Sequence, residues 1–328
     1  MIVIGFDTSN YTTSVAAFDG ESGENVSRLL PVKAGELGLR QSEALFSHIK
    51  RLPELSDRLF ASVSAGEIAA IGVSTRPRAV EGSYMPCFLA GESQAGVLAS
   101  ALHVPLYAFS HQQGHIAAVL WSAGRMDLLG REFLAWHLSG GTTELLLVRS
   151  TKQGEIDCEK LGGTTDISAG QLIDRTGQLL GLPFPAGKAL DALAARAESD
   201  AALGAAAGAD APGLDWFRVK VNGFSFSLSG VQNQVQSYRA KGAGDAQTAY
   251  FALRSVVEAV KLATKHAQKE YPLPVLFSGG VASNSMLRAM MPQAVFGAPQ
   301  YSTDNAMGVA VLTHRSVLTA GGQNGAQG

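Results

Sequence analysis

The sequence predicts an α/β protein of two lobes that open in the same way. Its first residues alternate strand, short polar loop and strand, in "MIVIGFD", "TSNYT" and "TSVAAFD". The same pattern returns at residues 132–150, in "EFLAWHL", "SGGTT" and "ELLLVRS". A buried strand that ends in glycines, "PVLFSGG", follows later in the chain. With 328 residues, the chain is long enough for two such domains.

Strands and helices alternate through the rest of both halves. In the first half we expect a strand at 25–30, a helix at 42–62 that Pro53 bends or splits, a strand at 67–75, a helix at 89–102 and a strand at 104–110. In the second half we expect a loop at 204–213 and helices at 169–180, 188–197, 246–270, 284–291 and 304–318. We place the first lobe at residues 1–109, completed by the helix 304–318, the second lobe at 110–303, and a flexible tail at 319–328.

Composition and charge indicate a cytoplasmic globular protein. The net charge of -2 creates no overall attraction for nucleic acid or a membrane, so a nucleic-acid role needs a local basic patch or a partner. Cys87 and Cys158 lie far apart and do not form a disulfide framework. The first residues have the pattern of a strand and not of a signal peptide. The most apolar stretch, 87–109, is interrupted by polar residues, which argues against a membrane span.

Two polar hairpin tips are typical of actin-like and sugar-kinase-like nucleotide-binding folds. In such folds the two lobes face each other, and their tips grip phosphates with backbone N–H groups. In the second tip, Gly140 and Gly141 permit close approach of a ligand, and the hydroxyl group of Ser139 adds a donor. From the two hairpins we expect an actin-like ATPase fold, a duplicated RNase H-like (ASKHA) architecture. For the second tip itself, an ordinary tight turn explains the same residues.

Three further residues are candidates for the same ligand. Asn284 follows "FSGGVAS", where a ligand crevice lies in open α/β sheets, but a helix N-cap is an equally ordinary use for it. Asp174 is expected inside a helix, where Asp is unfavourable, and suits either a surface salt bridge or a ribose hydroxyl. Gly187 ends a proline-rich turn that is positioned to reach the same cleft.

His111 and His115 stand four residues apart in "HQQGH", on one face of a predicted helix. The motif looks like the zinc-protease helix, but Gln112 replaces the glutamate that acts there as general base, so proteolysis is not expected. Asp304, expected at the start of the last long helix, is the candidate third ligand. Two imidazoles and a carboxylate suit zinc or ferrous iron. A structural or solvated pair of histidines remains the alternative.

Taken in order, these segments resemble the TsaD family, the tRNA threonylcarbamoyladenosine synthase subunits formerly described as O-sialoglycoprotein endopeptidases. The resemblance covers nearly the whole chain. The blocks that carry it are "IGFDTSNYTTSVAAFD", "VPLYAFSHQQGHIAA", "SGGTTELLLV", "GTTDISAGQLIDRTGQLLGLPFPAG", "FSLSGV", "SGGVASNSMLR" and "STDNA".

The resemblance implies a site and a reaction. The family's metal ligands correspond to His111, His115 and Asp304, for one divalent ion, iron or zinc. ATP or threonylcarbamoyl-AMP would be bound at Ser139, Gly140, Gly141, Asp174, Gly187 and Asn284. The implied reaction transfers the threonylcarbamoyl group from the adenylate to N6 of the tRNA adenosine beside the anticodon, with the metal polarising the donor. Partner proteins, among them a TsaB-like subunit or a second copy of the chain, would help to engage the tRNA.

Several positions depart from the family pattern. The family has an Asp-Glu pair in its first loop, where this chain has Tyr11 and Thr12, so a candidate base is lost and the catalytic residue is unknown. A Gly-Pro-Gly loop is replaced by Arg76-Pro77-Arg78, which fits an anionic substrate or simple surface charge. Thr142 replaces a histidine, and Gln171 replaces a glutamate. These departures indicate a divergent paralogue.

Three functions follow from this pattern. The first is a TsaD-like, metal-dependent acyltransferase, which the intact metal ligands favour. The second is a catalytically impaired relative that binds nucleotide and metal and acts as a partner subunit, which the lost acids favour. The third and weakest is an actin-like ATPase or kinase. A purely structural metal is a further alternative, although a chain of this length needs no such help to fold.

Overall fold

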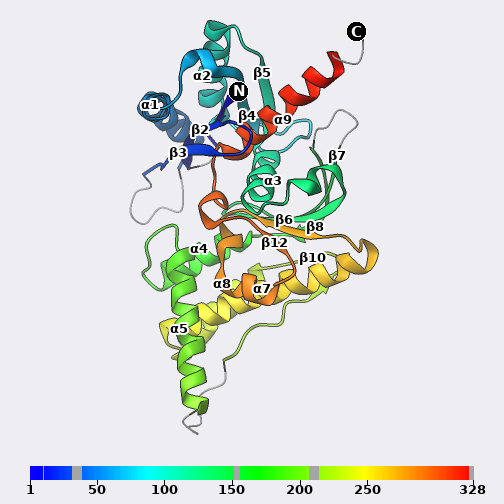
Figure 1. Ribbon diagram of the computed structural model, residues 1–328. Helices are drawn as coiled ribbons and strands as arrows, with labels where there is room; N and C mark the ends of the chain where they lie inside the picture. The colour runs from blue at the N-terminus through cyan, green and yellow to red at the C-terminus, as the bar shows by residue number, and fades with distance from the viewer. Residues whose placement is uncertain (10, 32–38, 151–155, 207–213, 325–328) are drawn as a thin grey trace. The chain divides into compact units, whose positions relative to one another are not determined.

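The protein has an α/β architecture in which two groups of strands and helices each form a sheet with its own core (Figure 1). The computed structural model describes residues 1–9, 11–31, 39–150, 156–206 and 214–324. By their contacts, residues 1–132, 148–158 and 297–328 form one unit, and residues 133–147 and 159–296 form a second. The lobe boundaries predicted at residues 109/110 and 303/304 stay a prediction.

The first unit is built on a mixed sheet in the order β3-β2-β1-β4-β5. Its strands are β1 (Ile2–Asp7), β2 (Thr12–Phe18), β3 (Gly23–Leu29), β4 (Ile68–Arg76) and β5 (Leu106–Ser110). The first three strands pair antiparallel, whereas β4 and β5 run parallel to β1. Its helices are α1 (Gln41–Phe60), α2 (Phe88–Leu102), α3 (His111–Ser122) and α9 (Met307–Asn324), with short 3-10 turns η1 (Ala65–Glu67), η2 (Met126–Gly130) and η4 (Pro299–Tyr301).

Both faces of this sheet are covered, which explains the continuous apolar run of β1. Ile4 and Phe6 point into a core shared with α1 and α2. Gly5, on the opposite face, lies against the backbone of Ala306 and of Ala310 in the first turn of α9. The carboxyl ends of strands β1 and β5 therefore lie beside the start of α3 and the turn before α9.

The second unit repeats this topology. Its sheet has the order β12-β11-β6-β7-β8-β10-β9, so the five strands β8-β7-β6-β11-β12 follow the same pattern as the first sheet. The strands of this sheet are β6 (Phe133–Leu138), β7 (Thr143–Ser150), β8 (Ile156–Thr164), β9 (Val221–Asn222), β10 (Ser225–Phe226), β11 (Val275–Ser278) and β12 (Val295–Phe296). The end of β7 and the start of β8 fall within residues 148–158, which group with the first unit. The helices are α4 (Ala169–Leu179), α5 (Gly187–Ala206), α6 (Ser229–Ala240), α7 (Asp245–Glu270) and α8 (Ser285–Met290), with a 3-10 turn η3 (Gly280–Ser283).

Most elements lie where the sequence predicts them, and the differences have physical reasons. Helix α5 continues to Ala206 instead of ending at residue 197, because the alanine-rich continuation favours helix over loop. Helix α6 is unpredicted, because it buries only Val231 and Val235 and so has a weak apolar stripe. Helix α9 starts at Met307, three residues later than expected, and includes residues 319–324 of the predicted tail. The remaining parts of the predicted loop and tail, 207–213 and 325–328, lie outside the described residues.

Helix α1 runs through Pro53 without being split into two helices. Among the described residues, no helix combines the length and the apolar character that crossing a bilayer requires.

Candidate metal centre and nucleotide-binding segments

The start of helix α3 presents both motif histidines on one side. Ser110 is the N-cap: its Oγ accepts a hydrogen bond from Gln113 N at 3.2 Å, and its N–H donates to Gln113 Oε1 at 2.8 Å. This capping box sets where the helix begins, so His111 is its first residue. With a spacing of four residues, the rings of His111 and His115 lie 4.3 Å apart.

Asp304 lies in the turn between η4 and α9, not at the start of the helix as predicted. The neighbouring Asn305 holds this turn: its Oδ1 accepts from Met307 N at 3.1 Å, and its Nδ2 donates to Thr303 O at 2.7 Å. The backbone N–H of Ala306 donates to Ser14 Oγ on β2, at 2.9 Å. The sheet thereby fixes the loop that carries the carboxylate.

A close helix crossing brings the two parts of the site together. At the crossing of α3 and α9, a Cβ atom on Gly308 would overlap the carbonyl oxygen of Gly114 and lie 2.6 Å from its carbonyl carbon. Only glycine allows the helices to approach this closely. Gly114 lies between the two histidines in sequence, so the crossing places their shared face next to Asp304.

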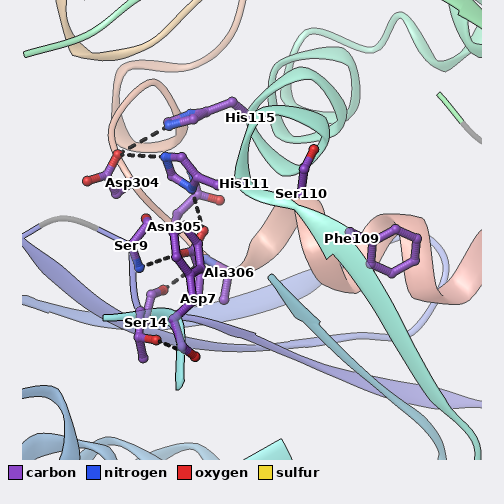
Figure 2. Close-up of polar contacts among 12 residues, drawn as sticks. Asp7, Ser9, Ser14, Phe109, Ser110, His111, His115, Asp304, Asn305 and Ala306 are labelled. Atoms are coloured by element: carbon purple, nitrogen blue, oxygen red, sulfur yellow. Dashed lines mark hydrogen bonds and ion pairs between the residues drawn. The ribbon is translucent and has the colours of Figure 1, made fainter. Parts of the chain in front are cut away.

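The three predicted metal ligands converge within the first unit. Their ligand atoms all lie within 4.8 Å of one another. Asp304 Oδ1 is 3.2 Å from His115 Nε2 and 3.4 Å from His111 Nε2 (Figure 2). Both imidazoles are buried, and the Asp304 side chain is 19% exposed, so the cluster is reached from the carboxylate side. The three side chains that the sequence predicts as ligands thus lie together, and their role as metal ligands stays a prediction.

The structure adds a fourth residue, Asp7, that the sequence reasoning did not propose for the site. Asp7 ends β1 and is 1% exposed. Its Oδ2 accepts a hydrogen bond from His111 Nδ1 at 2.8 Å, and its Oδ1 accepts from Ser9 N at 2.7 Å. The available indication was its place at the carboxyl end of a buried strand, where sites form in α/β sheets.

The cluster has coupled electrostatics. Burial opposes a charge on His111, but the carboxylates of Asp7 and Asp304 outweigh burial and raise the pKa of His111 to about 10. Burial, and then the neighbouring His111 charge, lower the pKa of His115. Burial would raise the pKa of both carboxyls, but hydrogen bonds and charge from the histidines hold the pKa of Asp7 and Asp304 below the usual range.

The donor set fits a divalent metal ion. Two imidazole nitrogens and one carboxylate oxygen are the ligands that zinc or ferrous iron takes in open sites. The carboxylate of Asp7 on the outer nitrogen of His111 is the usual support of a metal-binding imidazole. Once His111 has lost its extra proton, the two carboxylates balance the charge of one divalent ion.

The candidate phosphate loop of the second unit forms the tight turn between β6 and β7. Ser139 N donates to Thr142 O at 2.8 Å, and Thr142 N donates to Ser139 Oγ at 3.1 Å. Gly140 and Gly141 at its tip are exposed, and a Cβ atom at either would meet nothing within 4 Å. Among the described residues, the N–H groups of Gly140 and Gly141 donate no hydrogen bond within the protein.

Helix α4 packs directly against this tip. Ser168 Oγ donates to Gly140 O at 2.6 Å, and a Cβ atom on Gly170 would lie 2.5 Å from Gly140 Cα. Gln171, which replaces the family's glutamate, forms the capping box of α4 with Ser168. The substitution therefore preserves a helix cap, since an amide oxygen accepts the N-cap N–H as a carboxylate does.

Asp174 contacts the residue directly before Gly187, which is the first residue of α5. Asp174 Oδ1 accepts from Ala186 N at 2.9 Å, directly before Gly187. Among the described residues Asp174 forms no salt bridge, so the backbone contact replaces the predicted ion pair. Burial raises the pKa of the Asp174 carboxyl. Its suitability for a ribose hydroxyl stays a prediction.

Asn284 is the N-cap of α8. Its Oδ1 accepts from Leu287 N at 2.8 Å, and its Nδ2 donates to Asp191 Oδ1 at 2.7 Å. Both ends of the amide are thus used inside the protein, which matches the capping alternative. A nucleotide contact by Asn284 stays a prediction.

Two of the departures from the family pattern, at residues 11–12 and 76–78, lie in the first unit, which also holds the candidate metal ligands. Tyr11 and Thr12 form the turn into β2, where Tyr11 O accepts from Leu30 N and Thr12 N donates to Ser9 O. Arg76 and Arg78 are exposed, and Pro77 O between them accepts from Gln112 N, beside His111, at 3.1 Å. Neither a phenol nor an alcohol replaces the carboxylates as a base at neutral pH.

Known proteins resemble this chain over most of its length. The family model described as TsaD, tRNA N6-adenosine threonylcarbamoyltransferase, matches residues 36–311. A protein of Carboxydothermus hydrogenoformans with the name tRNA N6-adenosine threonylcarbamoyltransferase is 30% identical over 336 residues, which cover 97% of this chain and 93% of that protein.

Solved structures of more distant proteins share the actin-like fold. HypF in a phosphate- and nucleotide-bound form superposes with a TM-score of 0.58 at 12% identity, over 97% of this chain and 46% of HypF, so the chain spans about half of HypF. An activator of 2-hydroxyisocaproyl-CoA dehydratase from Clostridium difficile, with bound ADPNP, gives a TM-score of 0.51 at 11% identity, over 99% of this chain and 97% of the activator. At such identities the likeness establishes the fold alone.

Proposed function

The chain belongs to the TsaD family of tRNA N6-adenosine threonylcarbamoyltransferases, and on that premise we propose that it is a metal-dependent acyltransferase. Its reaction moves a threonylcarbamoyl group from the adenylate to N6 of the tRNA adenosine beside the anticodon. The convergence of His111, His115 and Asp304 on one point supports the proposal most directly.

The residues of the first unit have distinct roles in this proposal. His111 Nε2, His115 Nε2 and Asp304 Oδ1 hold one divalent ion, iron or zinc, which supplies Lewis acidity for polarising the acyl carbonyl. Burial of both imidazoles excludes water from the protein side of the centre. Gln112 cannot act as a general base as the glutamate of a zinc protease does, so we propose that the protein does not cleave peptide bonds.

Nucleotide binding is proposed for the second unit. The exposed backbone of Gly140 and Gly141 suits a phosphate contact through its N–H groups, and Ser139 braces their turn. Gly140→Ala tests this site, because the added methyl group enters open space and so leaves the fold intact while obstructing a phosphate. We expect at least about tenfold weaker binding of an ATP analogue by calorimetry.

Gly230→Ala on α6 is the matched control, since its added methyl group also meets nothing within 4 Å. It should bind the ATP analogue like the wild type. Equal affinity of both variants for the ATP analogue would show that the hairpin tip is not part of the nucleotide site.

The catalytically impaired partner subunit remains the second candidate, because Tyr11 and Thr12 stand where the family has its acids. Both candidates predict metal and nucleotide binding, and only the first predicts transfer. For either, we propose a TsaB-like subunit as partner, bound through α1 and α2, which expose large apolar side chains: Phe46, Ile49, Leu89 and Val97.

A transfer assay separates the two candidates. Unmodified tRNA, threonylcarbamoyl-adenylate and the partner proteins are mixed with the wild type or with His115→Ala, and the nucleosides are analysed by mass spectrometry. The acyltransferase predicts modified adenosine with the wild type and at least about a hundredfold less with His115→Ala, because the metal loses a ligand. His103→Asn is the control, since His103 is exposed in a left-handed position that asparagine tolerates.

The outcome with the wild type decides between the functions. If the wild type forms no modified adenosine while the Carboxydothermus relative does so in the same mixture, the partner-subunit function replaces the enzymatic one.

A further inference from the structure

The β1–β2 hairpin lacks the family's acids in its loop, but Asp7, the last residue of β1 before that loop, is a carboxylate that contacts a candidate metal ligand. Asp7 Oδ2 lies 2.8 Å from His111 Nδ1, and the two residues are 104 positions apart in the sequence. Figure 2 shows the His111 ring between Asp7 on one side and Asp304 on the other. The hairpin is therefore linked to the metal centre through a side chain.

We propose that Asp7 is a positioning residue: its carboxylate holds the N–H at Nδ1 of His111, which leaves Nε2 as the nitrogen that binds the metal ion. This inference rests on the metal site of the proposed function. In this chain the hairpin then orients the His111 ring for metal binding, and it does not supply a general base.

Hydrogen-bond chemistry determines the direction of this contact. An ionised carboxylate only accepts, so the nitrogen that faces it must donate. With the hydrogen on Nδ1, a neutral His111 has its lone pair on Nε2, which faces Asp304 Oδ1 at 3.4 Å. A lone pair and a carboxylate oxygen at that distance repel each other unless a proton or a cation lies between them. The geometry thus provides a place for a cation on the side of Nε2.

Asp7 is itself held rigidly. Its second oxygen accepts from Ser9 N at 2.7 Å, and the side chain is 1% exposed at the end of the central strand. Since both oxygens are engaged, the carboxylate cannot rotate away from His111 without breaking a second hydrogen bond. The ring orientation of His111 is consequently tied to the backbone of β1.

Asp7→Asn tests the proposal because it preserves size and removes one acceptor. The asparagine oxygen can satisfy either Ser9 N or His111 Nδ1, but not both in the present orientation. If the oxygen stays with Ser9, the NH2 group faces Nδ1 and drives the hydrogen of a neutral His111 onto Nε2, which blocks the metal-binding nitrogen. We therefore expect Co²⁺ affinity, measured by chelator competition, to fall about 10- to 100-fold.

Asp19→Asn is the matched control, since Asp19 is an exposed carboxylate of the β2–β3 turn that bonds backbone N–H groups. It should bind Co²⁺ like the wild type. A double-mutant cycle adds a second readout: in a His111→Ala background, Asp7→Asn should weaken residual Co²⁺ binding by less than about twofold, because Asp7 acts through His111. A full loss in that background would show a general structural effect and overturn the proposal.

The wild type provides a test that does not depend on whether a variant folds. A long-range proton–nitrogen NMR spectrum of the Zn²⁺-loaded protein should show His111 protonated at Nδ1 and coordinated at Nε2. Coordination through Nδ1, or Asp7→Asn with wild-type Co²⁺ affinity, would overturn the proposal. Failure of the wild type to bind either ion through these histidines would instead overturn the metal site of the proposed function.

Discussion

Replacing Gly308 by alanine tests whether the crossing of α3 and α9 positions the metal ligands. The added Cβ would lie 2.6 Å from the carbonyl carbon of Gly114 and 2.9 Å from Ala118 N, whereas real contacts of this kind stay beyond 3.0 Å. The helices must therefore separate by at least about 0.4 Å, and by more to clear the carbonyl oxygen of Gly114. Metal–ligand distances tolerate only about 0.2 Å.

We expect Gly308→Ala to cost about 1–3 kcal/mol of unfolding free energy and at least about tenfold in metal affinity. Urea unfolding measures the first quantity and chelator competition the second. Gly321→Ala on the same helix is the control, because its Cβ meets nothing within 4 Å. Its stability should be unchanged or higher by up to about 1 kcal/mol. Wild-type stability and metal affinity in Gly308→Ala would refute the argument that backbone contact between the helices sets the site.

Three further predictions concern protonation, association and reactivity. Because the pKa of His111 is raised to about 10, the metal-free protein holds a proton that the ion must displace, so apparent metal affinity should rise by up to about tenfold per pH unit from pH 6 to 8. Chelator competition across this range measures it, and a constant affinity would contradict it. Phe46→Ser should weaken association with a TsaB-like partner by about 10- to 100-fold in ultracentrifugation, since Phe46 is 63% exposed. Equal association by the variant would contradict the proposed surface, and association only with a second copy of the chain would contradict the proposed partner. Burial raises the pKa of the Cys158 thiol to about 12, so Cys158 in the native protein should react slowly with iodoacetamide at pH 8. Mass spectrometry measures the labelling, and rapid labelling of Cys158 would disprove the prediction.

The duplicated fold was predictable because its indicators are local. A hairpin with a polar tip opens each half, and strict strand and helix patterns follow, so β1–β2 and β6–β7 could be located from sequence alone. The end of α5 was not predictable in the same way, because the composition that suggested a loop also has high helix propensity. Helix α6 buries too few side chains to produce a clear pattern.

The candidate metal ligands could be named from the sequence because the histidine spacing and a family resemblance both pointed to them. The supporting residues could not, since their role depends on contacts between distant parts of the chain. Asp7 reaches His111 across 104 positions, and Ser14 reaches Ala306 across 292. The use of Asn284 as a cap was foreseen as one of two alternatives, and only the contact with Asp191 shows that both ends of its amide are occupied.

The most direct test of the account is anomalous diffraction from crystals of the protein grown with Zn²⁺ or, without oxygen, with Fe²⁺. The account predicts one strong peak per chain, at bonding distance from His111 Nε2, His115 Nε2 and an Asp304 oxygen, with Asp7 hydrogen-bonded to Nδ1 of His111. An ion held by other residues, or no peak at these three atoms when the crystals contain ample metal, would contradict it.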